Sequence, residues 1–226
     1  MISAKEVLKI LHEAADPSEL AGMARFAIAT EGRLGISIYG LRRIARSIPP
    51  AHALALELWD TGIQEARLLA SMIDVPAEAT DDQLERWAAD FNSWDICDQV
   101  CDNLFQKTPF AWRKISEWHT RGEEFVKRAA YALIACKAWH DKAASDVQFT
   151  GLFPVIKTGA SDPRNFVKKA VNWAIRNIGK RNLALNQAAI AFSEELLLMD
   201  DKTARWIARG ALSEMQSDKM QARLRK

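Results

Sequence analysis

A chain of 226 residues can form one large domain or an array of small helical units, and a formal net charge of +2 is too small to attract a polyanion by itself. Three cysteines are an odd number in a chain of this size, the N-terminus lacks the apolar core of a signal peptide, and no apolar run reaches membrane-spanning length. We therefore expect a soluble, cytoplasmic protein with no membrane partner. The histidines and cysteines lack metal-ligand spacing, so we also expect no metal and no cofactor.

Helical periodicity runs through almost the whole sequence, in segments separated by turn-forming residues. Only residues 147–156 resemble a strand, and Gly151 and Pro154 favour a break between two helical pieces there. Helix pairs that recur at roughly 35 residues favour a single all-α domain, 1–226, built as a HEAT-like α-solenoid of antiparallel helix pairs, with a globular bundle as the alternative. The predicted helices cover about residues 3–14, 17–30, 36–48, 50–60, 63–74, 80–91, 94–106, 109–119, 122–139, 142–157, 163–180, 182–199 and 201–216.

Acidic and basic residues are segregated along the chain. Residues 78–102 contain eight Asp or Glu and one Arg, whereas residues 164–181 contain six Lys or Arg and no acid. A pattern of this kind is typical of a protein with an electropositive side, although a solvated face without function is an alternative.

The helix predicted at 163–180 places a tryptophan opposite its apolar side. At 100° per residue, Val167, Val171, Ala174, Ile175 and Ile178 gather on one side, and Trp173 lies on the other with Lys169, Arg176 and Lys180. Two interpretations remain open. Trp173 packs against a neighbouring element with the lysine stems around it, or it contacts a ligand with a flat part next to negative charge, as nucleic acid has.

The helix predicted at 94–106 combines an aromatic residue with a carboxylate. Asn92 is the expected N-cap, and Cys97 and Cys101 lie on the core face as reduced thiols. Trp94 and Asp98 are one turn apart on the flank of that face. A carboxylate beside a ring at the edge of a core is partly desolvated, which favours electrostatic work on a cationic group. The alternative is a Trp that covers the core edge and an Asp paired with a local Arg.

Two further basic features suit contacts with phosphate. Arg128 shares its helix face with small residues, so it can approach a phosphate or pair with an acid. Arg42, Arg43 and Arg46 form a basic turn that suits a DNA backbone or a solvated face. Phe26, earlier in the chain, is compatible with a core or a surface position.

Three stretches in order, "SWDICDQV", "FVKRAAYAL" and "FVKKAVNWAIRNIGKRN", resemble the AlkD-type DNA alkylation repair proteins, which are HEAT-like-repeat DNA glycosylases. The stretches "MARF", "LGIS", "LRRIARSI" and "LELWDTGIQEARLLASMI" extend this resemblance to most of the chain. The resemblance implies a monofunctional enzyme that removes cationic N3- and N7-alkylated purines from duplex DNA, held in a concave basic cleft. A non-catalytic helical-repeat scaffold that binds nucleic acid or protein is the alternative. We expect a monomer.

The resemblance also implies roles for single residues. Asp98 falls on the catalytic aspartate, which stabilises an oxocarbenium-like sugar and positions water. Trp94 and Trp173 fall on the lesion-contacting tryptophans, and Phe26 on an aromatic residue that frames the cleft. Arg128 falls near the backbone of the lesion, and the phosphates are contacted by the basic face of Lys169, Arg176 and Lys180. The chain departs from the family twice: Ser93 stands where a second aromatic precedes the W-D motif, and Phe26 stands in place of Tyr.

Overall fold

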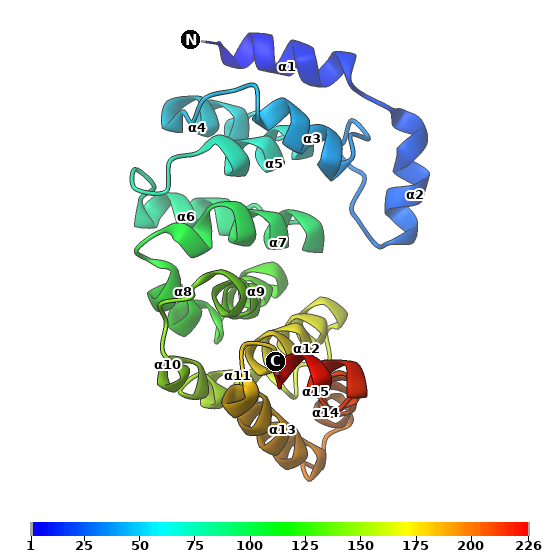
Figure 1. The fold of residues 1–226 in the computed structure, drawn as a ribbon. Coiled ribbons are helices and arrows are strands. Elements are labelled where there is room, and N and C mark those ends of the chain that lie inside the picture. Colours follow the sequence, from blue (N-terminus) through cyan, green and yellow to red (C-terminus); the bar gives the residue numbers. More distant parts are fainter. Residues whose placement is uncertain (1, 226) are drawn as a thin grey trace. The chain divides into compact units, whose positions relative to one another are not determined.

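The computed structural model describes residues 2–225, which contain helices and no strand (Figure 1). The predicted all-α class is therefore confirmed. The described residues divide after Phe110 into two compact units. Residues 1 and 226, the two ends of the predicted single domain, lie outside the described part of the chain.

The first unit contains seven α-helices and two short 3₁₀ helices within its described residues. Helices α3, α5 and α7 pack side by side in one layer, in which α5 contacts both of its neighbours. Helices α4 and α6 stack through the parallel rings of Trp59 and Trp87, whose centroids are 3.9 Å apart. The elements are α1 (Ala4–Glu13), η1 (Pro17–Glu19), α2 (Leu20–Arg25), α3 (Ile38–Ala45), α4 (His52–Asp60), α5 (Gln64–Ile73), α6 (Asp81–Ala89), α7 (Trp94–Asn103) and η2 (Phe105–Lys107).

A long loop separates α2 from α3, where the sequence predicted helix up to residue 30. Helix α2 ends at Arg25, and Ala27 has a left-handed backbone with φ of 56°. The buried carboxylate of Glu65 accepts hydrogen bonds from the N–H groups of Leu34, Gly35 and Ile36. The prediction of helix over 26–30 was wrong, since backbone groups of this segment bond to side chains more than 60 positions away, at Ser93 and Trp94, which no local pattern records.

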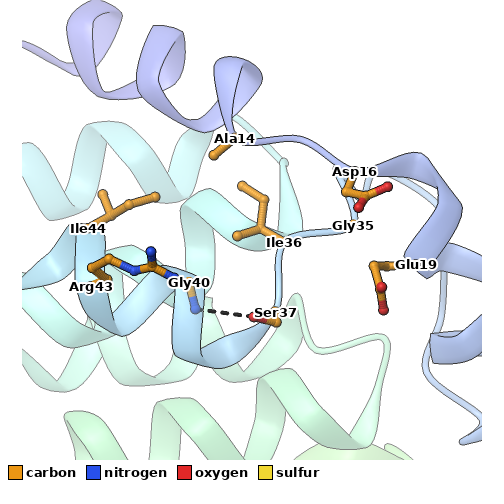
Figure 2. A pocket seen from close by; sticks show the side chains of 9 residues that line it. All are labelled: Ala14, Asp16, Glu19, Gly35, Ile36, Ser37, Gly40, Arg43 and Ile44. Atoms are coloured by element: carbon orange, nitrogen blue, oxygen red, sulfur yellow. Dashed lines mark hydrogen bonds between the residues drawn. The ribbon is translucent and has the colours of Figure 1, made fainter.

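Gly35 is required for this loop. Its φ is 83°, and a side chain there would collide with the backbone carbonyl of Asp16. Figure 2 shows the two residues next to each other at the edge of a hollow, which is lined by Ala14 after α1 and by parts of η1 and α3. The close approach ties the segment that enters α2 to the segment that leaves the loop.

The second unit contains eight helices within its described residues. The break expected near Gly151 and Pro154 is confirmed, because α10 and α11 are separate there. Helix α15 was not predicted. The elements are α8 (Ala111–Trp118), α9 (Glu124–His140), α10 (Asp146–Thr150), α11 (Phe153–Gly159), α12 (Asn165–Gly179), α13 (Leu183–Leu197), α14 (Lys202–Met215) and α15 (Asp218–Leu224).

Helix α12 lies between α9 and α14 in one layer of this unit, and α13 packs against α12 and α14. Helices α12 and α14 run parallel, because the side chain of Asn172 donates to the Ile207 carbonyl and Gly179 faces Met215 further along both helices. The apolar face expected for α12, including Val167, Val171 and Ile175, is fully buried. No helix within residues 2–225 is long and apolar enough to cross a membrane.

Candidate active site and nucleic-acid interface

Helix α7 begins at Trp94 and carries Asp98 one turn later, with both side chains partly exposed. Ser93 is the N-cap, so the prediction of Asn92 at this position was wrong. The hydroxyl of Ser93 accepts a hydrogen bond from the Ala29 N–H at 3.2 Å instead of capping its own helix. This serine thus joins the α2–α3 loop to the start of α7. Cys97 is a buried cysteine on the core face, as predicted.

Trp94 and Phe26 are held together by a backbone contact. The indole N–H of Trp94 donates to the carbonyl oxygen of Phe26 at 2.9 Å. The ring of Phe26 is 73% exposed, which resolves the choice between core and surface in favour of the surface. Trp94, Phe26 and Asp98 therefore lie in one region of the first unit. The Phe26 ring is exposed, the Trp94 ring is partly exposed, and the Asp98 carboxylate is one helical turn after Trp94.

An ion pair that the sequence did not reveal supports this region. The guanidinium of Arg33 donates to both carboxylate oxygens of Asp95, at 2.6 and 2.8 Å, and to the Ala29 carbonyl at 2.6 Å. The two side chains retain only 2% and 14% of their exposed surface. Asp95 lies directly after Trp94, so the loop that carries Phe26 is bound to the first turn of α7 by Trp94, Asp95 and Ser93 together.

Arg128 is buried between α9 and α12 in the second unit. Its Nη1 donates to the Phe166 carbonyl at 2.5 Å, and the Phe125 and Phe166 rings lie 5.4 Å apart beside it. The small residues expected on this face of α9 are covered by α12. Arg128 thus holds the first turn of α12, and its contact with phosphate stays a prediction.

Acidic residues from outside the basic stretch neutralise three of its cations. Asp162 accepts from Arg164 through Nε and Nη2, and Glu214 of α14 forms ion pairs with Arg176 and Lys180. Burial alone would raise the pKa of Glu214, but the hydrogen bond from Lys180 and the charges of Arg176 and Lys180 lower it below the usual value. The free positive charge of α12 is therefore smaller at its C-terminal half than the sequence indicates.

The remaining cations of this stretch differ from one another. Arg181 donates to the carbonyls of Ala138 and Ala144 and lies over the Phe149 ring. In the described part of the chain, Lys168 and Lys169 have no acidic partner. Lys169 is exposed one turn before Trp173, which is partly exposed as predicted for the polar side of the helix.

A basic hollow of about 610 Å³ in the first unit brings Arg42, Arg43 and Arg46 together with Lys107. Among the residues that the structure describes, its lining contains Tyr39, whose ring is 75% exposed, and no acid. The hollow lies along α3 and beside the last residues of α5 and α7. Lys107 and Tyr39 were not expected there, because the helical register alone does not join them to the three arginines. The hollow in Figure 2 differs, since Asp16 and Glu19 line it together with Arg43.

Within residues 2–225, no group of His, Cys, Asp or Glu is arranged to hold a metal ion. The side chains described above are aromatic rings, cations and the Asp98 carboxylate, on helices that pack against one another in pairs. These features define a helical-repeat protein with surfaces suited to DNA.

The family model described as "DNA alkylation repair enzyme" matches residues 7–215, and the chain belongs to this family. A solved structure described as belonging to "a new family of proteins related to the HEAT-like repeat DNA glycosylases with affinity for branched DNA structures" is similar, with a TM-score of 0.81 and 19% identity over 99% of this chain and 96% of the other. The predicted HEAT-like repeat class is thereby confirmed. A designed armadillo repeat protein bound to a peptide aligns at a TM-score of 0.39 and 16% identity, over 83% of this chain and 79% of the other. No curated protein matches the chain.

Proposed function

We propose that this protein is a monomeric, monofunctional DNA glycosylase that hydrolyses the N-glycosidic bond of cationic N3- and N7-alkylated purines in duplex DNA. The observation that carries the proposal is the gathering of Asp98, Trp94 and the exposed Phe26 at the start of α7. A carboxylate beside aromatic rings is suited to a substrate that is flat and positively charged. The family to which the chain belongs, described as DNA alkylation repair enzymes, supports the same conclusion.

The chemistry requires few groups. An alkylated purine that carries positive charge leaves as a neutral base, so no acid is needed to protonate it. The sugar then acquires positive charge, which an ionised Asp98 stabilises while it orients the attacking water. Trp94 contacts the cationic nucleotide through its ring, and its bond to the Phe26 carbonyl fixes the orientation of that ring. Trp173 contributes a second ring contact in this proposal.

Phosphate binding is assigned to cations of both units. In the first unit, the basic hollow that contains Arg42, Arg43 and Arg46 accepts the DNA backbone. In the second unit, Lys169 contacts phosphate directly, and Arg176 and Lys180 do so in competition with Glu214. Arg128 acts near the backbone of the lesion, and its buried bond to Phe166 positions the start of α12.

The test is release of 7-methylguanine from methylated duplex DNA by the wild-type protein and by Asp98→Asn. Loss of one electrostatic contact of the transition state lowers rates by about 10²–10³, and we expect this loss with most DNA affinity kept. Asp102→Asn, the same change one turn later on α7, is the matched control and should retain excision. Wild-type rates in a folded Asp98→Asn protein would remove Asp98 from the mechanism.

A second candidate function is DNA binding without base excision. It is favoured by the fold similarity to a protein described as having affinity for branched DNA, and by Ser93, which leaves one aromatic residue fewer than the glycosylases have before the W-D motif. If the wild-type protein releases no methylated base but binds a four-way junction more tightly than a duplex of equal length, this second function replaces the first.

A further inference from the structure

Trp206 is an aromatic residue at the surface of the second unit, in addition to Trp173. It lies on α14 with 45% of its surface exposed, and the Lys168 ammonium group of α12 lies 5.1 Å from the centre of its ring. The neighbouring Ile207 receives the hydrogen bond from Asn172, which fixes the register of the two parallel helices at this point. Trp206 and Lys168 therefore face each other where α12 and α14 pack together.

Lys168 is the cation next to this ring, and two further cations, Lys169 and Arg209, lie close to it along the two helices. Arg209 is three residues after Trp206, so the two share one face of α14, and Lys169 follows Lys168 on α12. Among residues 2–225, none of Lys168, Lys169 and Arg209 forms an ion pair. This distinguishes them from Arg176 and Lys180, which Glu214 neutralises further along the same two helices. The positive charge of the second unit that no acidic side chain compensates thus includes Lys168 at an exposed indole and two cations close to it along α12 and α14.

The lysine–tryptophan contact at Trp139 differs from the one at Trp206 in how firmly its lysine is held. Trp139 is 57% exposed, and Lys142 lies 5.6 Å from the centre of its ring. Lys142, however, also donates to the Trp139 carbonyl at 2.5 Å, so its ammonium group is bound in place. Lys168 has no such bond in the described structure, and its flexible side chain can move from the ring to a phosphate.

We propose that unpaired nucleotides of DNA stack on Trp206, with their phosphates contacted by Lys168, Lys169 and Arg209. Bases in a duplex already stack on one another and cannot reach a ring at the surface, whereas unpaired bases stack on aromatic side chains irrespective of their sequence. The surface therefore selects single-stranded segments, as occur beside lesions and at branches. The inference rests on the DNA-binding part of the proposed function and is independent of base excision.

The test compares binding of a single-stranded oligothymidylate and of a duplex of equal length by fluorescence anisotropy. We expect Trp206→Ala to weaken single-strand binding by roughly ten-fold, as loss of one stacked base does, and to change duplex binding much less. Trp206→Phe keeps a ring and should retain most of the affinity. Trp139→Ala removes a tryptophan with the same kind of lysine contact and should leave single-strand binding unchanged.

A double variant provides a second test that does not remove a tryptophan. Lys168→Gln with Arg209→Gln should lower the log–log salt slope of single-strand binding by about 0.7 per lost phosphate contact. Equal single-strand affinity of Trp206→Ala and wild type, or an unchanged slope in the double variant, would overturn the proposal. Absence of base excision by the wild-type protein would contradict the glycosylase activity alone, because these binding measurements do not involve it.

Discussion

Arg33 and Asp95 form a nearly buried ion pair that binds the α2–α3 loop to the first turn of α7. The pair lies one residue from Trp94, whose indole holds the Phe26 carbonyl of the same loop. Asp95 also occupies a helix N-terminus, where a negative charge is favourable. The position of Phe26 relative to Trp94 therefore depends on a contact between residues 62 positions apart in the sequence.

Arg33→Gln should destabilise the protein by about 3–5 kcal/mol, because it leaves the Asp95 carboxylate without its charged partner in a mostly buried place. Urea unfolding measures this change. Arg86→Gln is the control, since the Arg86–Asp60 pair is 3.8 Å long with more than half of each side chain exposed, and its loss should cost less than about 1 kcal/mol. Equal costs for the two variants would mean that the Arg33 pair does not hold the loop.

Trp173→Ala should lower excision of 7-methylguanine more than it lowers stability. Trp173 is partly exposed, so its truncation removes less buried surface than that of Trp118, which is fully buried in the same unit. Trp118→Ala should cost roughly 3–5 kcal/mol, and Trp173→Ala clearly less. Thermal unfolding and excision are measured on the same preparations. A large fall in melting temperature with normal activity per folded molecule would assign Trp173 to the core.

Glu214→Gln should strengthen binding to duplex DNA and steepen its salt dependence. The substitution frees Arg176 and Lys180 from their acidic partner, and each new phosphate contact adds about 0.9 to the log–log slope. Glu117→Gln is the control, because Glu117 likewise bridges two cations, Arg113 and Lys114, on α8. Similar gains in both variants would show a general effect of net charge.

The same glutamate gives a pH dependence. Its pKa is lowered in the folded protein, so its ion pairs stabilise the fold above the ordinary glutamate pKa of 4.5, and this stabilisation is lost as the pH falls through the lowered folded value. The stability difference between wild type and Glu214→Gln should therefore be full at neutral pH and shrink below about pH 4.5. If the stability difference between wild type and Glu214→Gln stayed constant across this pH range, the ion pairs of Glu214 would not be its source.

The basic hollow of the first unit should contribute to duplex binding through charge. Changing Arg42, Arg43 and Arg46 together to Gln should lower the log–log salt slope by about 0.9 for each phosphate contact that is lost. Lys5 and Lys9 on α1 provide the control, because they lie outside the hollow. An unchanged slope in the triple variant would mean that the three arginines only solvate the surface.

The repeating helices, the buried face of α12, the partly exposed Trp173 and the turn that separates Trp94 from Asp98 could all be predicted from the sequence. Each depends on the 3.6-residue period of a helix, which is a local property of the chain. The family resemblance, carried by short stretches in a fixed order, likewise needed no coordinates and is confirmed by the family model.

Other features depended on contacts between distant residues. The segment after α2 leaves the helical conformation where Trp94 binds the Phe26 carbonyl. Ser93, and not Asn92, is the N-cap of α7, and its hydroxyl accepts from the Ala29 N–H. Arg128 is buried by α12 rather than left open above small residues.

The charge of the second unit shows most clearly which features depend on the sequence alone and which depend on contacts between distant residues. The sequence alone determined that residues 164–181 are basic, because composition is a property of the chain. Only the tertiary structure decided which of those charges an acid neutralises. Glu214 on α14 pairs with Arg176 and Lys180, whereas Lys168, beside Trp206, has no acidic partner among residues 2–225. The physical reason is that Coulomb interactions depend on distance in space, which the packing of α12 against α14 sets and the order of residues does not.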